Sequence, residues 1–144
     1  MSQPPPARPA IERALPVRTY DIDFAGVVGN IVYVRWLEDL RLALMDEAYP
    51  IARALADDVA PILLATRIRY ERPVTIQDAL LGRMWVTAME KVRWTVAAEF
   101  LVGGRRHAEA EQDGLFIRLS TRRPIAPPRA LRERFAPETL GAER

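Results

Sequence analysis

A single long amphipathic segment between residues 31 and 48 restricts the folds that this chain can adopt. Its charged residues fall mostly on one side, while its apolar residues recur at steps of three and four: Tyr33, Trp36, Leu37, Leu40, Leu44 and Ala48. That period is typical of an α-helix that buries one face. Asn30 is positioned to cap this helix and Pro50 to end it, so we expect a helix of about 17 residues.

Stretches rich in β-branched and aromatic residues follow the helix and predict strands. They cover residues 61–70, 79–90, 93–102 and 105–119. Gly103-Gly104 predicts a two-residue hairpin turn, because both glycines adopt positive φ at little cost. Lys91-Val92 predicts another tight connection, and Asp113-Gly114 predicts a bulge inside the last strand.

The two ends of the chain are expected to differ from its centre. Residues 1–13 carry Pro4, Pro5, Pro6 and Pro9 and predict a flexible proline-rich tail, and residues 137–144 are expected to form a second flexible end. Residues 14–136 are expected to form one folded domain that opens with a short strand at residues 15–20. Helical turns are expected at 51–58, a proline-broken segment at 122–128 and a short closing helix at 129–135.

Strands that are segregated from a helix argue for an α+β fold, in which a curved antiparallel sheet wraps around one long helix and buries its apolar stripe. Such a two-layer unit leaves the helix partly uncovered. A second copy of the chain would complete the burial, so we expect a homodimer at least.

Composition limits the class of protein further. The length of 144 residues suits one domain, and 49% hydrophobic residues can build a buried core. No apolar run reaches the roughly 18 to 20 residues that a membrane span needs, and the first residues carry no secretion signal. Cysteine is absent, which excludes disulfides and agrees with a reducing compartment. We therefore expect a cytoplasmic protein.

Arginine dominates the basic residues, because Lys91 is the only lysine among 21 Lys and Arg residues. Arginine can grip phosphate through paired hydrogen bonds. A phosphate-bearing partner and genome composition both account for this count. Nucleic acid is not an expected partner, since acidic residues are interspersed almost everywhere along the chain.

Several kinds of hydrolase are excluded by the side chains that are missing. His107 is the only histidine, and Ser2 and Ser120 are the two serines, so a Ser-His-Asp triad is not expected. One histidine without cysteine does not supply a typical zinc site, and we expect no metal and no cofactor. His107 itself is interpreted as a surface or rim residue.

The chemically most distinctive stretch is the loop that leads into the helix, with Asp21, Asp23, Gly26 and Gly29 before Asn30. A helix N-terminus presents free amides and about half a unit of positive charge, which attracts a polarised carbonyl oxygen. A carboxylate opposite this end could attack the carbonyl carbon or deprotonate a water that does. The alternative is that both aspartates only shape the turn and cap the helix electrostatically.

The run Asp21-Ile22-Asp23-Phe24-Ala25-Gly26-Val27-Val28, followed by Tyr33, Trp36, Glu38 and Arg41, resembles the signature of the 4-hydroxybenzoyl-CoA thioesterase family, which includes acyl-CoA thioesterases. Arg72-Pro73-Val74 and the prolines of residues 124–128 agree with it. The resemblance implies a hotdog fold, with a curved antiparallel sheet around one long central helix. It also implies paired subunits, often paired again into a homotetramer, with active sites at the dimer interface.

The resemblance implies hydrolysis of an acyl thioester, on coenzyme A or an acyl-carrier protein, to a free acid and a thiol. The family's catalytic aspartate falls on Asp23, as nucleophile or general base; its polarising amide falls near Asn30, and Gly26 holds the loop. Asp21 is assigned to loop structure. The candidate substrate-binding residues are Val28, Gly29, Tyr33, Leu63, Leu64, Ala65 and Thr66, the last four on the strand that lines the acyl pocket in relatives.

Other functions stay open. Many relatives carry histidine or tyrosine at Asn30 and asparagine at Val32, and these departures motivate a non-catalytic acyl-thioester-binding protein of the same fold. A hydratase of this fold usually needs an aspartate-histidine pair in another loop, and His107 is poorly placed for it. A nucleic-acid-binding module rests only on the arginine count.

Overall fold

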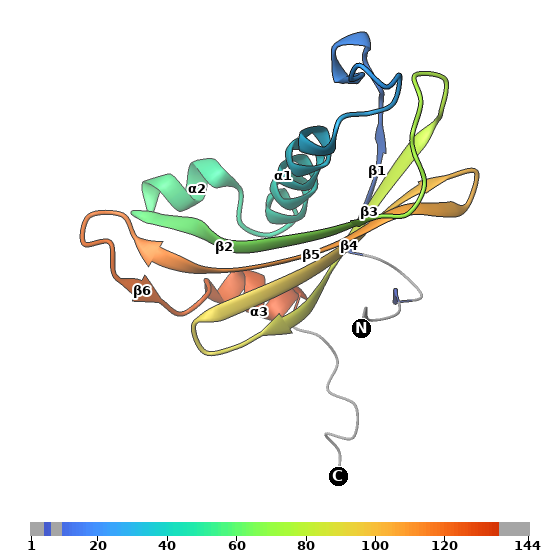
Figure 1. The fold of residues 1–144 in the computed structure, drawn as a ribbon. Coiled ribbons are helices and arrows are strands. Elements are labelled where there is room, and N and C mark those ends of the chain that lie inside the picture. Colours follow the sequence, from blue (N-terminus) through green and yellow to red (C-terminus); the bar gives the residue numbers. More distant parts are fainter. Residues whose placement is uncertain (1–4, 7–9, 136–144) are drawn as a thin grey trace.

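In a computed structural model, residues 5–6 and 10–135 of the chain are described (Figure 1). The flexible end predicted at 137–144 lies outside them, as does most of the tail predicted at 1–13. The elements in chain order are β1 (Ile11–Leu15), η1 (Thr19–Asp21), α1 (Asn30–Asp46), α2 (Ile51–Ala56), β2 (Val59–Tyr70), β3 (Leu80–Met89), β4 (Arg93–Val102), β5 (Arg105–Arg118), β6 (Pro124–Ile125) and α3 (Arg129–Phe135).

The strands form one antiparallel sheet in the order β1-β3-β4-β5-β2, and β6 pairs with β5. Figure 1 shows the sheet as curved, with α1 lying across one of its faces. The fold is therefore α+β. Because β2 pairs only with β5 within the described residues, it forms an edge of the sheet and leaves one side of its backbone without a partner strand.

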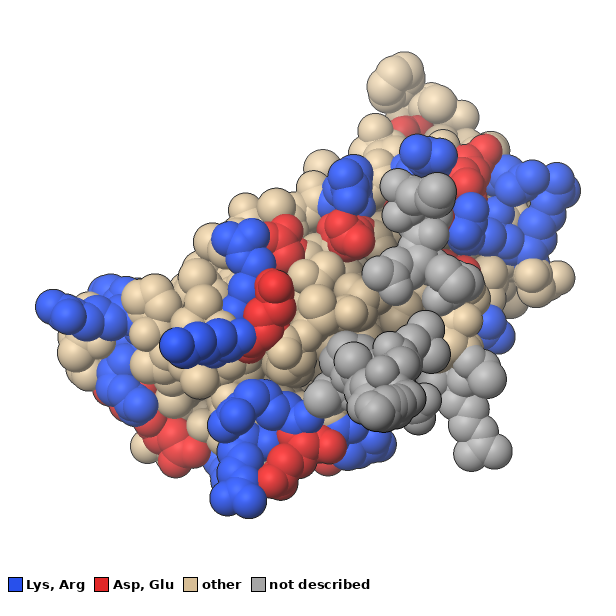
Figure 2. All heavy atoms as spheres, turned by 90° about the horizontal axis from the view of Figure 1, so that it is seen from below, with Lys and Arg blue, Asp and Glu red and all other residues tan. Residues whose placement is uncertain are grey.

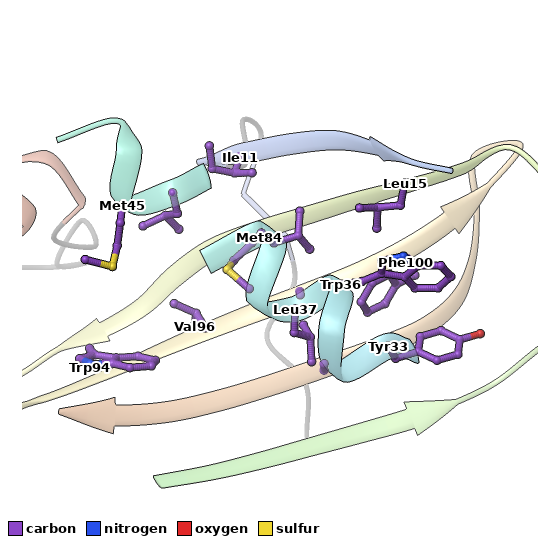
Figure 3. Close-up of a cluster of buried hydrophobic side chains, with 14 of the residues drawn as sticks. Ile11, Leu15, Tyr33, Trp36, Leu37, Met45, Met84, Trp94, Val96 and Phe100 are labelled. Carbon is purple, nitrogen blue, oxygen red and sulfur yellow. The ribbon is translucent and has the colours of Figure 1, made fainter. Parts of the chain in front are cut away.

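The core lies between α1 and the sheet. The buried residues of α1 are Val32, Tyr33, Trp36, Leu37, Leu40, Leu44 and Met45. They meet alternate residues of β3 and β4, including Met84, Val96 and Phe100, as Figure 3 shows. Leu37 and Leu40 are completely inaccessible to solvent, and full burial of a leucine side chain contributes about 1.5–3 kcal/mol. The amphipathic stripe of α1 therefore anchors it to the sheet.

Most elements predicted from the sequence are confirmed, and the main differences lie at the start of α1 and at the N-terminal end of the sheet. The helix α1 has 17 residues, but Gly29 and not Asn30 is its N-cap residue. The first strand was expected at residues 15–20, whereas β1 ends at Leu15 and a short 3-10 helix follows. Ile11, which was assigned to the flexible tail, is buried in β1. The sheet therefore begins earlier than the prolines suggested.

The sequence predicted a bulge in β5 at Asp113-Gly114, but the bulge lies in the neighbouring strand, β2. The register shift lies in β2 between Leu63 and Ala65, which makes Leu64 the extra residue opposite Asp113-Gly114. Gly114 is needed there because of close approach: an added Cβ would lie 2.2 Å from the carbonyl oxygen of Ile62 and 2.3 Å from the Trp94 ring. The glycine thus marks a crowded position beside the bulge.

The predicted turns are confirmed. Gly103 and Gly104 connect β4 to β5 with φ angles of +57° and +79°. Lys91 and Val92 lie in the turn that the Glu90 amide closes by donating to the Arg93 carbonyl at 2.7 Å. The sequence did not predict β6, which forms inside the proline-broken segment.

The face of the sheet away from α1 carries mixed charge. Figure 2 shows basic and acidic side chains close to one another over the surface seen from below. One cross-strand row runs Glu12, Arg83, Glu99, Glu109, Arg69 through all five long strands. Arg83 pairs with Glu12 at 2.7 Å and with Glu99 at 3.5 Å. Within the described residues, no helix combines the length and apolar character needed to cross a membrane.

Candidate active site

The loop between η1 and α1 is a closed backbone frame. Ile22 and Val28 form an isolated antiparallel bridge. Inside it, the Asp23 amide donates to the Val27 carbonyl at 2.8 Å, and the Gly26 amide donates to the Asp23 carbonyl at 3.0 Å. Gly26 has a φ of +82°, a conformation that residues with a Cβ adopt only at a cost. This explains the glycine that the sequence places at that position.

Asp21 braces the base of this loop. Its side chain is buried, and Oδ2 accepts a hydrogen bond from the Arg18 amide at 2.8 Å. Its backbone carbonyl accepts another from the Gly29 amide at 2.9 Å. These bonds support the structural role assigned to Asp21 from the sequence.

Asp23 lies on the exposed side of the same loop. Its Oδ1 atom accepts hydrogen bonds from the Ala25 amide at 2.8 Å and from the Val27 amide at 3.4 Å. This is an Asx turn, in which the side chain replaces a backbone acceptor. Oδ2 has no hydrogen-bond partner in the part of the chain that the structure describes. One oxygen therefore fixes the orientation of the carboxylate, and the other remains available.

The start of α1 lies directly beside Asp23. A Cβ added at Gly29 would be 3.8 Å from the Cβ atom of Asp23. Among the described residues, the amides of Asn30 and Ile31 meet no acceptor, whereas the Val32 amide donates to the Gly29 carbonyl at 3.0 Å. Two free N–H groups at a helix start attract a partly negative oxygen. The structure thus brings Asp23, Gly26, Gly29 and Asn30 together.

Tyr70 ties this helix start to the edge strand, and the sequence reasoning missed it. Its hydroxyl donates to the Asn30 carbonyl at 3.0 Å, and its ring packs edge-on against Tyr33 at 5.0 Å between centroids. Burial raises the pKa of the Tyr70 hydroxyl. The only sequence signal was an aromatic residue at the end of a predicted strand.

The candidate substrate-binding residues fall into two groups. Val28 and Tyr33 are buried beside the loop, and burial together with Tyr70 and Asp78 raises the pKa of Tyr33 to about 12. Leu63, Leu64, Ala65 and Thr66 are exposed on β2, and Thr66 accepts a hydrogen bond from Gln112 at 2.9 Å. Thr66 and Tyr70 are about 13 Å apart along an extended strand. None of the cavities of the described chain is lined by a residue of either group.

Three cavities of about 340, 380 and 430 Å³ mark the surface of the described chain, and neither Asp23 nor Asn30 lines any of them. The cavity of 380 Å³ lies between the second half of α1, α3 and the sheet and is mainly apolar. His107 is partly buried and donates from Nδ1 to the Pro73 carbonyl at 3.0 Å. Among the described residues, no group of three His, Asp or Glu side chains could hold a metal ion.

Comparison with solved structures shows that several thioesterases share the fold of this chain. A thioesterase from Thermus thermophilus, solved with coenzyme A and Zn, has a TM-score of 0.77 at 20% identity, over 88% of this chain and 92% of that one. The probable thioesterase YbaW from Escherichia coli has a TM-score of 0.76 at 22% identity, over 85% and 94%. The DHNA-CoA thioesterase from Staphylococcus aureus has a TM-score of 0.76 at 17% identity, over 80% and 78%.

The family follows from the sequence itself. The model of the thioesterase-like superfamily matches residues 17–135, so the chain belongs to that superfamily. No curated protein matches the sequence. The family resemblance stated from the Asp21–Val28 motif is thereby confirmed.

Proposed function

We propose that this protein hydrolyses an acyl thioester, carried by coenzyme A or by an acyl-carrier protein, to a free acid and a thiol. The observation that carries the proposal is the meeting of a carboxylate with the start of α1: Asp23 has a free Oδ2 atom, and the unpaired amides of Asn30 and Ile31 lie next to it. Membership of the thioesterase-like superfamily supports the same reaction.

In this mechanism the thioester carbonyl oxygen accepts hydrogen bonds from the Asn30 and Ile31 amides. With Asp23 as general base, Oδ2 takes a proton from water while the water oxygen bonds to the carbonyl carbon. The negative charge that develops on the carbonyl oxygen is stabilised by the two amides and by the positive end of the helix dipole. The C–S bond then breaks, and the thiolate takes a proton from Asp23. With Asp23 as nucleophile, Oδ2 bonds to the carbonyl carbon while the same amides stabilise the charge on the carbonyl oxygen. The C–S bond then breaks to give a mixed anhydride and a thiolate that takes a proton from water, and a water molecule hydrolyses the anhydride to the free acid and the Asp23 carboxylate.

We further propose that the working site is completed by a second copy of the chain. The unpaired edge of β2 carries exposed Leu63, Leu64 and Tyr70, and the neighbouring surface of α1 exposes Ile31 and Val34. A long apolar edge strand is a template for pairing with another strand. Antiparallel pairing of two β2 strands over their full length would set Tyr70 of one subunit beside Val59 of the other. This would enclose Asp23, which a single chain leaves open.

The competing proposal is a non-catalytic acyl-thioester-binding protein of the same fold. Its support is the Asx turn of Asp23, since Oδ1 is already engaged by the Ala25 and Val27 amides. If Asp23 only shapes the loop, these two hydrogen bonds account for the position of its side chain without a catalytic role.

The experiment is a thiol-release assay with a broad panel of acyl-CoAs on wild type, Asp23→Asn and Asp21→Asn. We expect Asp23→Asn to fold normally and to lose roughly 10²- to 10⁴-fold in kcat, the usual contribution of a general base. Asp21→Asn should lose much less, because the amide oxygen of asparagine can still accept from Arg18.

Equal losses in the two variants, or none in either, would refute the assignment of roles. Saturable binding of acyl-CoA without thiol release from any member of the panel would favour the binding protein.

A further inference from the structure

The apolar cavity at the far end of α1 is not part of the site described above. Its volume is about 380 Å³, and its walls include Met45, Met89, Trp94, Phe116, Leu131 and Phe135. Figure 3 shows Met45, Trp94 and Val96 at this end of the core. Cavities of this size and apolar character suit small organic groups.

One charged side chain interrupts this apolar wall. Arg41 lines the cavity with only 19% of its side chain exposed. Its Nη1 atom donates to Gln112 Oε1 at 2.6 Å, and Gln112 in turn donates to Thr66 at 2.9 Å. Its nearest carboxylate is that of Glu38, 3.6 Å from Nη2 and largely in solvent. Burial lowers the pKa of Arg41. A guanidinium has five N–H groups, so this one is held in place with donors to spare.

The Trp94 ring lies in the same wall, but its indole nitrogen is not a second donor to the cavity, because that atom is buried and has no hydrogen-bond acceptor among the described residues. The cavity thus combines an apolar lining with one fixed guanidinium, which matches a ligand that is mostly hydrocarbon and carries an oxygen.

The position of the cavity connects it to the thioester site. Within one chain, Asn30 and Arg41 are about 16 Å apart along the helix. Ala60 and Pro61, at the start of β2, line the cavity, whereas Tyr70, at the end of β2, contacts the helix start. In the antiparallel pair proposed above, the helix start of one subunit therefore lies beside the cavity of the other.

From these observations we propose that the cavity binds the far end of the acyl group and that Arg41 donates a hydrogen bond to an uncharged oxygen atom of the acyl group there. The preferred substrates are thioesters of acyl groups with a hydroxyl or keto oxygen remote from the thioester. This inference rests on the proposed hydrolase function and names its substrate class. The neighbouring Glu38 carboxylate favours a neutral oxygen over a carboxylate, since it accepts from a hydroxyl but repels an anion.

The test compares matched pairs of acyl-CoAs, unsubstituted and ω-hydroxylated, over short, medium and long chains, with an ω-carboxylated series as a third arm. We expect wild type to prefer the ω-hydroxy member by roughly 10- to 100-fold in kcat/KM, the range that one hydrogen bond to a charged group supports. Arg41→Met should bring this ratio close to one, because kcat/KM for the ω-hydroxy member falls further than kcat/KM for the unsubstituted member. The matched control is Arg35→Met, an exposed residue of the same helix outside the cavity, which should keep the wild-type ratio.

Two results would overturn the inference. An equal loss on both members of each pair in Arg41→Met would show that Arg41 only anchors α1 through Gln112. Gln112→Leu checks this, because it removes the hydrogen bond between Arg41 and Gln112 but keeps the guanidinium in the chain. A purely structural Arg41 predicts the same equal loss in this variant, whereas recognition of the ω-oxygen predicts that a preference for the ω-hydroxy member remains. A wild type that hydrolyses both members equally, or that prefers the ω-carboxy series, would also overturn it.

The closing measurement separates this inference from the proposed function. If wild type releases thiol from no substrate, the hydrolase proposal fails. Calorimetry with non-hydrolysable thioether analogues of the same pairs still tests Arg41. If wild type binds the ω-hydroxy analogue more tightly than the unsubstituted analogue, and Arg41→Met does not, the result supports a hydrogen bond from Arg41 to the ω-oxygen. Equal binding of the two analogues by wild type contradicts it.

Discussion

Replacing Gly114 by alanine tests the packing between β2, β5 and the wall of the apolar cavity. The added Cβ would meet the Ile62 carbonyl oxygen at 2.2 Å and the Trp94 ring at 2.3 Å. The first contact is with backbone in a neighbouring strand, so it cannot be relieved by rotating a side chain. Both the bulged strand and the indole must move.

Overpacking a tight core by one carbon typically costs about 1–3 kcal/mol. Because two separate contacts are violated, we expect the upper end, about 3 kcal/mol. For a chain of 144 residues, each kcal/mol lowers Tm by about 2–4 °C, which gives a fall of about 6–12 °C.

The measurement is thermal unfolding followed by circular dichroism, with Gly104→Ala as the matched control. An alanine at Gly104 meets nothing within 4 Å and is disfavoured only by its φ of +79°, at about 1–2 kcal/mol. The reasoning is refuted if Gly114→Ala melts within about 2 °C of wild type or above Gly104→Ala.

Two further predictions concern the aromatic cluster and the edge strand. The pKa of Tyr33 is raised to about 12, above the ordinary value near 10 of a tyrosine in an unfolded chain. The stability that neutral Tyr33 contributes is therefore complete below about pH 10 and is lost as the pH rises toward about 12. Tyr33→Phe should show a smaller fall in Tm between about pH 10 and about pH 12 than wild type, and an identical fall would contradict the raised pKa. Leu64→Glu places a charge on the exposed edge of β2, and we expect light scattering to give the mass of a monomer and the thiol-release assay to show a loss of activity. Leu55→Glu on α2 is an exposed control that should keep the wild-type mass. An unchanged mass in Leu64→Glu would rule out pairing through β2.

The fold could be predicted where a local pattern and its tertiary role coincide. The stripe of α1 follows a helical period, and β4 begins and ends where its composition predicts. The strand β1 was missed because only Ile11 and Leu15 are buried in it, so it shows no alternation. Asp113-Gly114 was misread because a glycine signals either unusual φ or close approach, and the sequence does not say which.

Only the part of the candidate site that lies within one short stretch of the sequence could be predicted. Asp21, Asp23, Gly26 and Asn30 lie within one short loop, and their order already predicted that a carboxylate would face a helix start. Tyr70 joins the site from 40 residues away. Arg41 reaches the sheet through Gln112, 71 residues later. Such contacts depend on strand order, which local sequence does not encode.

The frame around Asp23 has a consequence for how this protein could diversify. The Val28 amide is bound to the Val74 carbonyl, and the Gly29 amide to that of Asp21, so the backbone is held from two sides without help from the side chain at the tip. Phe24, at that tip, is fully exposed. The side chain at position 24 can therefore be exchanged while the backbone hydrogen bonds beneath it stay in place, so variation at this tip need not disturb the frame that holds Asp23.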